Sequence, residues 1–280
     1  MDFLNGEDTC HNGDMTGKIK RQTFHKGRFG GSYCWCVRGV FSALMLLSGG
    51  VHASLRPGDS PPDLRPAPDL SIRVYATEIK GARSMALAPD GTVYVGTRDE
   101  GKVYAVRDLD GDGTADQVRV LAEGLQMPNG VAVLNGDLYI AEMTRIIKIP
   151  RSELEKPARS EPVVIAEGFP PKVMHGWKAL KVGPDGWLYL AVGVPCNICR
   201  PEAPFEGRLL RVDPERGTTE ILAEGLRNSV GLAFDPWQHD LWLTENGRDH
   251  LGEDQPPDEL NRYRQKGMHF GFPFCFGAKI

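Results

Sequence analysis

The stretch SMALAPDGTVYVGTRDEGKVYAVRD, residues 84–108, decides the fold, because the chain repeats its pattern at intervals of roughly fifty residues. The further copies are GVAVLNGDLYIAEMTRIIKIPR (130–151), ALKVGPDGWLYLAVG followed by an insertion and GRLLRVD (179–213), and GLAFDPWQHDLWLTENGRD (231–249). Each copy contains an apolar strand, a turn of the Pro-Asp-Gly or Asn-Gly type, a second strand with alternating Val, Tyr, Leu or Trp, and a third strand that ends in charged residues. The pattern predicts one small antiparallel sheet per copy.

A related outer strand follows the third strand in three of the copies. It reads QVRVLAEGL (117–125), PVVIAEGF (162–169) and TEILAEGL (219–226). Nothing between the strands has a helical period long enough for a crossover between parallel strands. We therefore predict an all-β protein, a β-propeller in which each copy forms one blade.

The number of copies indicates how many blades the chain contains. Four blades fit between about residue 70 and residue 280, whereas propellers usually close with more. The segment His269-Phe-Gly-Phe-Pro273 is typical of the start of a further blade. We interpret residues 70–280 as a partial propeller that is truncated at its C-terminal side. A complete four-bladed ring is the alternative, and an open ring would leave an unpaired strand edge.

The N-terminal residues differ in character from the repeats. Residues 1–53 are predicted to be a leader, because Lys26, Arg28 and Arg38 precede the apolar run VFSALMLL (40–47) and Val51-His-Ala53 offers a cleavage site. The apolar run is too short for a stable membrane span, so we expect a periplasmic or secreted protein. A loose N-terminal tail and a true start downstream of Met1 are the alternatives. Residues 54–69 are Pro-rich and are predicted to be a linker.

Composition narrows the class of protein. Apolar residues make up 41% and charged residues 25% of the chain, which is ordinary for a globular domain. The formal net charge is −4, and no basic patch with interleaved aromatic residues is present in the sequence. We therefore expect no nucleic-acid partner.

Two local motifs predict structural bonds. Cys196-Asn-Ile-Cys199 has the spacing of a redox or metal half-site, but no second CxxC completes a zinc site, and Arg200 replaces the histidine that haem attachment needs. In an oxidising compartment we expect a local disulfide that pins the insertion of the third repeat.

The second motif is an Asp-rich loop. Asp108, Asp110, Asp112 and Asp116 alternate with glycines, which suits a calcium loop that braces the chain rather than one that catalyses. An acidic turn between the third and fourth strands of the first blade is the alternative. The loop lacks the glutamate that an EF-hand has at its twelfth position, so we expect no EF-hand.

Four ordered motifs resemble the glucose/sorbosone dehydrogenase family over about residues 70 to 280. They are HGWKALKVGPDG (175–186), GLRNSVGLAFDP (225–236), TENGRD (244–249), and PDELN (257–261) followed by HFGFP (269–273). The Asp-rich loop and the Cys196–Cys199 insertion make the L-sorbosone dehydrogenase-like branch the closer match. The resemblance implies a six-bladed propeller with pyrroloquinoline quinone (PQQ) and calcium at the mouth of the central channel.

The resemblance also implies roles for matching residues. His175 matches the general base, which accepts a hydroxyl proton from a sugar or aldehyde hydrate while hydride leaves for the quinone. Arg227 and Asn228 match residues that hold the quinone oxygens. Gly247 and Arg248 match positions whose main-chain carbonyls hold the active-site calcium. The partners implied are a small sugar substrate and an external electron acceptor. Other cationic residues of the family site come from blades after the end of this chain.

Other readings of these residues stay open. Arg227 could pair with a carboxylate such as Glu224 or Asp235, and Asn228 could cap a turn. A propeller lactonase would use a channel calcium held by Glu245, Asn246 and Asp249. A non-catalytic propeller that binds a glycan or a protein is a third class.

Overall fold

Strands form nearly all of the regular structure in this computed structural model, which describes residues 55–156 and 162–277. The leader predicted at residues 1–53 lies outside the described residues. The one helix in the described part, α1 (Arg151–Leu154), is a single turn that the sequence patterns did not predict. No helix of the described residues has the length and apolar composition needed to cross a membrane.

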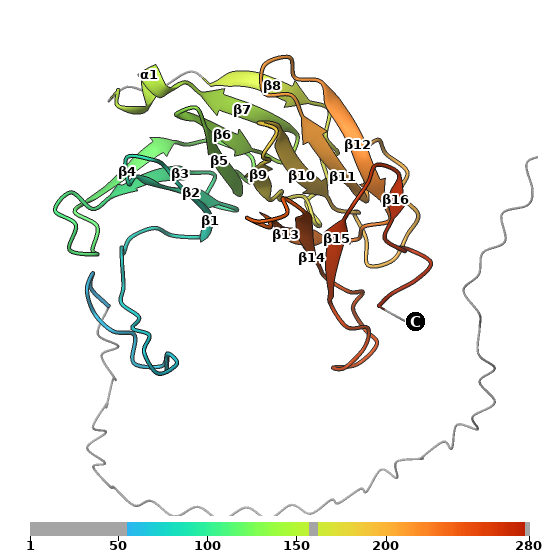
Figure 1. Ribbon diagram of the computed structural model, residues 1–280, viewed down its shortest axis with the longest axis horizontal. Helices are drawn as coiled ribbons and strands as arrows, with labels where there is room; N and C mark the ends of the chain where they lie inside the picture. Colours follow the sequence, from blue (N-terminus) through green and yellow to red (C-terminus); the bar gives the residue numbers. More distant parts are fainter. Residues whose placement is uncertain (1–54, 157–161, 278–280) are drawn as a thin grey trace, which may run out of the picture. The chain divides into compact units, whose positions relative to one another are not determined.

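The strands form four sheets in chain order (Figure 1). The first is β1 (Ala82–Leu87), β2 (Val93–Thr97), β3 (Val103–Arg107) and β4 (Gln117–Ala122). The second is β5 (Gly130–Leu134), β6 (Asp137–Ala141), β7 (Arg145–Ile149) and β8 (Val163–Glu167). The third contains β9 (Leu180–Val182), β10 (Leu188–Val192), β11 (Arg208–Val212) and β12 (Thr219–Glu224), and the fourth contains β13 (Ser229–Phe234), β14 (Leu241–Glu245) and β15 (Glu259–Tyr263).

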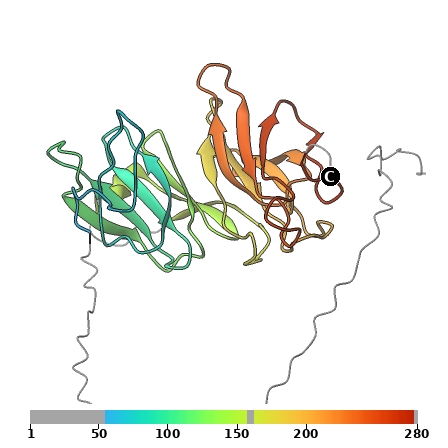
Figure 2. The same cartoon turned by 90° about the horizontal axis from the view of Figure 1, so that it is seen from below.

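Within each sheet these strands form an antiparallel meander, and the first strands of successive sheets contact one another: β1 with β5, β5 with β9, and β9 with β13. Figures 1 and 2 show the sheets following one another in chain order, each lying against the next. The phrases ending in Ala-Glu-Gly contain the outer strands β4, β8 and β12. The predicted all-β propeller, with four blades in this chain, is confirmed.

The same turn chemistry recurs from blade to blade. Asp90, Asp185 and Asp235 each accept a hydrogen bond at Oδ1 from the backbone N–H two residues ahead, at 3.0, 3.2 and 2.7 Å respectively. These side chains close the turn between the first and second strands of their blades. The second blade uses Asn135 and Gly136 instead, both at positive φ, as a tight hairpin of the Asn-Gly type requires.

Apolar side chains fill the spaces between adjacent blades. Leu138, Ile140 and Ile147 pack toward the first blade, and Leu188 and Leu190 pack with side chains of the second. Each of these five side chains is fully buried, and burial of such a side chain contributes about 1.5–3 kcal/mol. Stacking between blades therefore holds the loops of neighbouring blades in a fixed relation.

The C-terminal end of the described chain lies along the third blade. Met268 and His269 form β16, which pairs in parallel with β12 at the outer edge of the third sheet and begins the segment predicted to lead into a further blade. The N–H groups of Gly267, Phe270 and Phe272 donate to carbonyls of residues 222, 224 and 225 at 2.8–3.0 Å. The free carbonyls of this outer edge therefore provide partners for the segment.

Candidate functional site

A polar cleft of about 310 Å³ lies where the loops of the third and fourth blades meet. All five residues predicted to act in catalysis, cofactor binding or active-site calcium binding line this candidate cleft, namely His175, Arg227, Asn228, Gly247 and Arg248. They come from three segments, one before β9, one before β13 and one after β14. A larger cavity of about 940 Å³ between the first two blades contains none of them.

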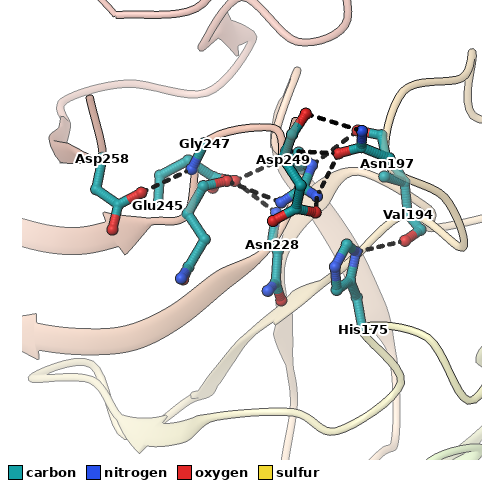
Figure 3. A network of polar contacts seen from close by, with 10 residues as sticks. His175, Val194, Asn197, Asn228, Glu245, Gly247, Asp249 and Asp258 are labelled. Carbon is teal, nitrogen blue, oxygen red and sulfur yellow. Dashed lines mark hydrogen bonds and ion pairs between the residues drawn. The ribbon is translucent and has the colours of Figure 1, made fainter. Parts of the chain in front are cut away.

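One ring nitrogen of His175 makes a hydrogen bond that holds the side chain in place. Its Nδ1 lies 2.8 Å from the carbonyl oxygen of Val194, so Nδ1–H donates and Nε2 keeps its lone pair (Figure 3). The side chain is buried, and burial lowers the pKa of His175 below its ordinary value. Neutral imidazole with a free Nε2 is the form that can accept a proton.

The backbone around His175 requires two close glycines. A Cβ on Gly193 would lie 2.5 Å from the Cβ of His175, and a Cβ on Gly176 would lie 2.0 Å from the carbonyl oxygen of Lys172. Neither position has space for a side chain. The histidine is therefore positioned by direct backbone packing between its own loop and the end of β10.

Glu245, the last residue of β14, organises the turn that carries Arg227 and Asn228. Its buried carboxylate accepts hydrogen bonds from the N–H groups of Arg227, at 2.9 Å, and Asn228, at 2.5 Å, and from the hydroxyl of Ser229. Burial raises the pKa of Glu245, and these three hydrogen bonds oppose the rise. The carboxylate therefore serves as an anchor for the turn.

Arg227 lies beneath the cleft surface with only 3% of its area exposed. Its guanidinium donates to the carbonyl oxygen of Asn197 at 2.8 Å, to Oδ1 of Asn197 at 2.9 Å, to the carbonyl oxygen of Asn246 at 3.2 Å, and to Oδ2 of Asp249 at 2.8 Å. A guanidinium has five N–H donors, so one, on Nη1, is left over. The carboxylate partner is Asp249, whereas the sequence suggested Glu224 or Asp235.

The remaining polar groups of the cleft make fewer hydrogen bonds with the described residues. The side-chain amide of Asn228 makes no hydrogen bond within the described part of the chain, and Nε of Arg248 is buried without a partner there. The carbonyls of Gly247 and Arg248 likewise accept no hydrogen bond from the described residues. Donors and carbonyl acceptors that lack protein partners suit an oxygen-rich planar ligand and a hard cation.

The loop after β14 is braced by residues that also line the cleft. The N–H of Gly247 donates to Oδ1 of Asp258 at 2.9 Å. A Cβ on Gly247 would lie 2.9 Å from Cγ of Pro256, so this position is crowded. Asp258 therefore supports the loop that carries Gly247.

The Asp-rich loop joins β3 to β4, far along the chain from the cleft residues. Side-chain oxygens of Asp108, Asp110 and Asp116 lie within 4.8 Å of one another. Asp112 is not in this group, and its carboxylate accepts from the N–H of Thr114 at 2.7 Å. Asp108 also accepts from the N–H groups of Gly111 and Gly113. The loop therefore combines an acidic cluster with ordinary turn hydrogen bonds.

The predicted disulfide is confirmed. Cys196 and Cys199 are bonded, with their Cα atoms 6.0 Å apart, in the insertion between β10 and β11. The bond closes a loop that carries Asn197 at the edge of the cleft. Asn197 contacts two residues of the site, and only its place between the two cysteines could have drawn attention to it in the sequence.

Lys178 is a buried cation that the sequence analysis missed. It is 1% exposed, and its Nζ donates to the carbonyl of Met143 and, at 2.9 Å, to that of Gly176. Burial lowers the pKa of Lys178 to about 7. Its place in an otherwise apolar run before β9 was the available signal.

Comparison with known proteins identifies the family. The family model described as a domain of unknown function, DUF7133, matches residues 88–268, more than half of the chain. The chain belongs to the DUF7133 family. The matched residues include His175, Arg227, Asn228, Gly247 and Arg248.

Curated relatives of this DUF7133 chain include an uncharacterised protein of Borreliella burgdorferi, 28% identical over 209 residues, which cover 71% of this chain and 53% of the relative. The aldose sugar dehydrogenase YliI of Escherichia coli is 33% identical over 107 residues, which cover 32% of this chain and 26% of the relative. The DUF7133 chain thus spans about half or less of the length of these relatives.

The fold of the DUF7133 chain is found among solved structures. The PQQ-bound form of an aldose sugar dehydrogenase from Streptomyces coelicolor matches with a TM-score of 0.58 and 21% identity, over 80% of this chain and 68% of that chain. The resemblance to the PQQ-dependent sugar dehydrogenases is therefore confirmed for the fold.

Proposed function

We propose that the candidate cleft is part of a PQQ-dependent dehydrogenase site that oxidises a sugar or a sugar aldehyde. The observation that carries the proposal is the state of His175, a buried, neutral imidazole with its Nδ1–H donated to Val194 and its Nε2 free. Asn228, Arg227 and two unpartnered carbonyls line the same cleft. Such a base beside oxygen-binding groups suits removal of a hydroxyl proton.

Each residue has a defined part in this proposal. Nε2 of His175 accepts the proton of the substrate hydroxyl. The side-chain amide of Asn228 and the free N–H of Arg227 donate to cofactor oxygens and hold them in place. The carbonyls of Gly247 and Arg248 bind calcium. PQQ, when bound, supplies the two-electron acceptor that takes the hydride, and an external acceptor reoxidises it.

The comparisons support this proposal from two directions. The E. coli relative is named an aldose sugar dehydrogenase, and the Streptomyces protein with the same fold was solved with PQQ bound. The Cys196–Cys199 disulfide fits the predicted export to the periplasm or outside the cell, because such bonds persist in oxidising compartments.

The lactonase alternative is less well supported by the geometry. Both carboxylates of its proposed calcium site already have partners, since Glu245 anchors the turn and Asp249 pairs with Arg227. Asn246 accepts from Arg227 through its carbonyl. A metal at this place would compete with these bonds for the two carboxylates.

An activity assay separates the classes. The purified chain is loaded with PQQ and calcium chloride and then offered aldoses and sugar aldehydes with an artificial electron acceptor. We expect acceptor reduction that depends on both PQQ and calcium, and no hydrolysis of sugar lactones. Lactone hydrolysis without PQQ would instead favour the lactonase.

We also propose that Asp108, Asp110 and Asp116 bind a second calcium ion, with Asp112 bracing the loop. Three carboxylates whose oxygens approach within 4.8 Å repel one another unless a cation lies between them. Calorimetric titration with calcium chloride should show a binding event that Asp108→Asn removes. The Asp254→Asn variant, which alters a carboxylate outside this group, is the control. An identical isotherm for Asp108→Asn and the wild type would leave the acidic turn as the correct reading.

A further inference from the structure

Among the hydrogen bonds of the described residues, those that join the disulfide loop to the candidate site are made by Asn197. Its Oδ1 accepts from Nη2 of Arg227 at 2.9 Å and from the N–H of Asp249 at 2.7 Å. Its Nδ2 donates to the carbonyl of Asp249 at 3.1 Å, and its own carbonyl accepts from Nε of Arg227 at 2.8 Å. Figure 3 shows Asn197 beside Asp249, with bonds running between them.

These four bonds account for much of the order around Arg227. Two of the four donations made by the guanidinium go to Asn197, and a third goes to Asp249, which Asn197 itself holds by two bonds. The partners are distant along the chain, because Arg227 is 30 residues from Asn197 and 22 from Asp249. Asn197 therefore links the insertion of the third blade to two loops of the fourth.

The cysteines fix the residue that makes these bonds. Asn197 lies directly after Cys196, in a loop with a sequence separation of 3 between the bonded cysteines. Ordering a free loop residue costs backbone and side-chain entropy. The disulfide closes a small ring that contains Asn197, which restricts the backbone of this residue before Arg227 is engaged.

We propose that Asn197 is a positioning residue, and that the Cys196–Cys199 loop is a clamp that fixes the guanidinium of Arg227 through it. The clamp leaves one N–H of Nη1 for a ligand in the cleft and fixes its direction. In the ligand-free protein, the clamp consists only of hydrogen bonds within this chain. Its consequence for ligand affinity rests on the proposed function, with PQQ as the ligand.

The first measurement needs no ligand. Exchange of the Nε–H of Arg227 with water is followed by ¹H–¹⁵N NMR of the full chain, and the resonance is assigned by its loss in Arg227→Lys. We expect slow exchange in the wild type, faster exchange in Asn197→Ala, and the fastest in the Cys196→Ser/Cys199→Ser double variant, where the backbone acceptor is also freed. Equal exchange rates in all three proteins would overturn the clamp.

The second measurement is the affinity for PQQ in the presence of calcium chloride. Partners that orient a ligand-binding group typically contribute about 10- to 100-fold to affinity or activity, and we expect a loss of this size in Asn197→Ala. Ile198→Ala, in the same loop with an exposed side chain, should bind as the wild type does. Thermal melting of each variant shows that it is folded. Wild-type affinity in a folded Asn197→Ala would contradict the proposal.

A double-mutant cycle separates positioning from a general structural effect. If Asn197 acts through Arg227, Asn197→Ala should cause no further loss of PQQ affinity in the Arg227→Lys background. Fully additive losses would show that Asn197 acts by another route and would overturn the inference. Failure of the wild-type chain to bind PQQ would overturn the proposed function, while the exchange measurement still decides the clamp.

Discussion

His175 has a left-handed backbone conformation, with φ of 53°, although it carries a full side chain. A residue held in this sparsely populated region costs about 1–3 kcal/mol, and such residues cluster at functional sites. The packing of Gly193 and Gly176 around it shows what maintains the conformation. This strained backbone supports a functional role for His175, because its free ring nitrogen must point in a defined direction in the cleft.

The pH dependence of turnover follows from the state of His175. Burial lowers its pKa, so the base stays neutral at pH values somewhat below the ordinary histidine range near 6.5. We expect kcat/KM of the PQQ-loaded chain to stay constant from neutral pH down to about 6.5 and to fall at lower pH. His175→Gln should reduce turnover by about 10²- to 10⁴-fold and remove this acidic limb. An unchanged acidic limb in His175→Gln would assign it to another group.

The segment that leads into β9 carries both His175 and Lys178. Nζ of Lys178 donates to the carbonyl of Gly176, directly after His175, and to the carbonyl of Met143 in the loop after β6. It therefore connects the third blade to the second. No salt bridge to a carboxylate accompanies it among the described residues. The segment therefore depends on a cation that is costly to bury.

Stability should depend on pH through this lysine. Its folded pKa of about 7 lies below the ordinary value of 10.5, so between these values the unfolded chain binds a proton that the folded chain lacks. The free energy of unfolding therefore rises with pH above about 7, by at most about 1.4 kcal/mol per pH unit. Urea unfolding at pH 7, 8 and 9 should show this rise in the wild type and in Lys181→Met, whose lysine is exposed, but not in Lys178→Met. A parallel rise in all three proteins would refute the assignment.

The strands that repeat along the chain could be predicted from the sequence, whereas contacts between segments distant in sequence could not. Alternating Val, Tyr and Leu, with turns of the Pro-Asp-Gly or Asn-Gly type between strands, located blades one to four because the same short-range chemistry recurs. β16 escaped prediction because, within the described residues, it pairs with the edge of β12, which is remote in sequence. Trp237 is 85% exposed, because it lies on the turn between β13 and β14 rather than on a strand.

The candidate site residues could be predicted from the sequence, whereas their hydrogen-bond partners could not. The loops of successive blades lie near one another because the blades stack, and this brings His175 and Asn228 to one cleft. The bonds of Arg227 to Asn197 and Asp249 depend on the path of two irregular loops, which no periodic pattern encodes. The sequence therefore indicated which residues meet, but not how their charges are balanced.

At the scale of the molecule, the cleft lies at the junction of the third and fourth blades, and its partners come from the insertion and loops around that junction. The cores between the blades consist mainly of buried apolar side chains, so they hold these loops in place. The site is thus a product of blade stacking, and its polar groups lie where two blades end.

Direct titration of the purified chain with PQQ, with and without calcium chloride, tests the central claim most simply. The account predicts calcium-dependent binding of one PQQ, weakened in Asn228→Ala and in Arg227→Lys and unchanged in Trp237→Ala, whose exposed side chain lies outside the cleft. Absence of binding, or binding that Asn228→Ala and Arg227→Lys leave intact, would contradict it.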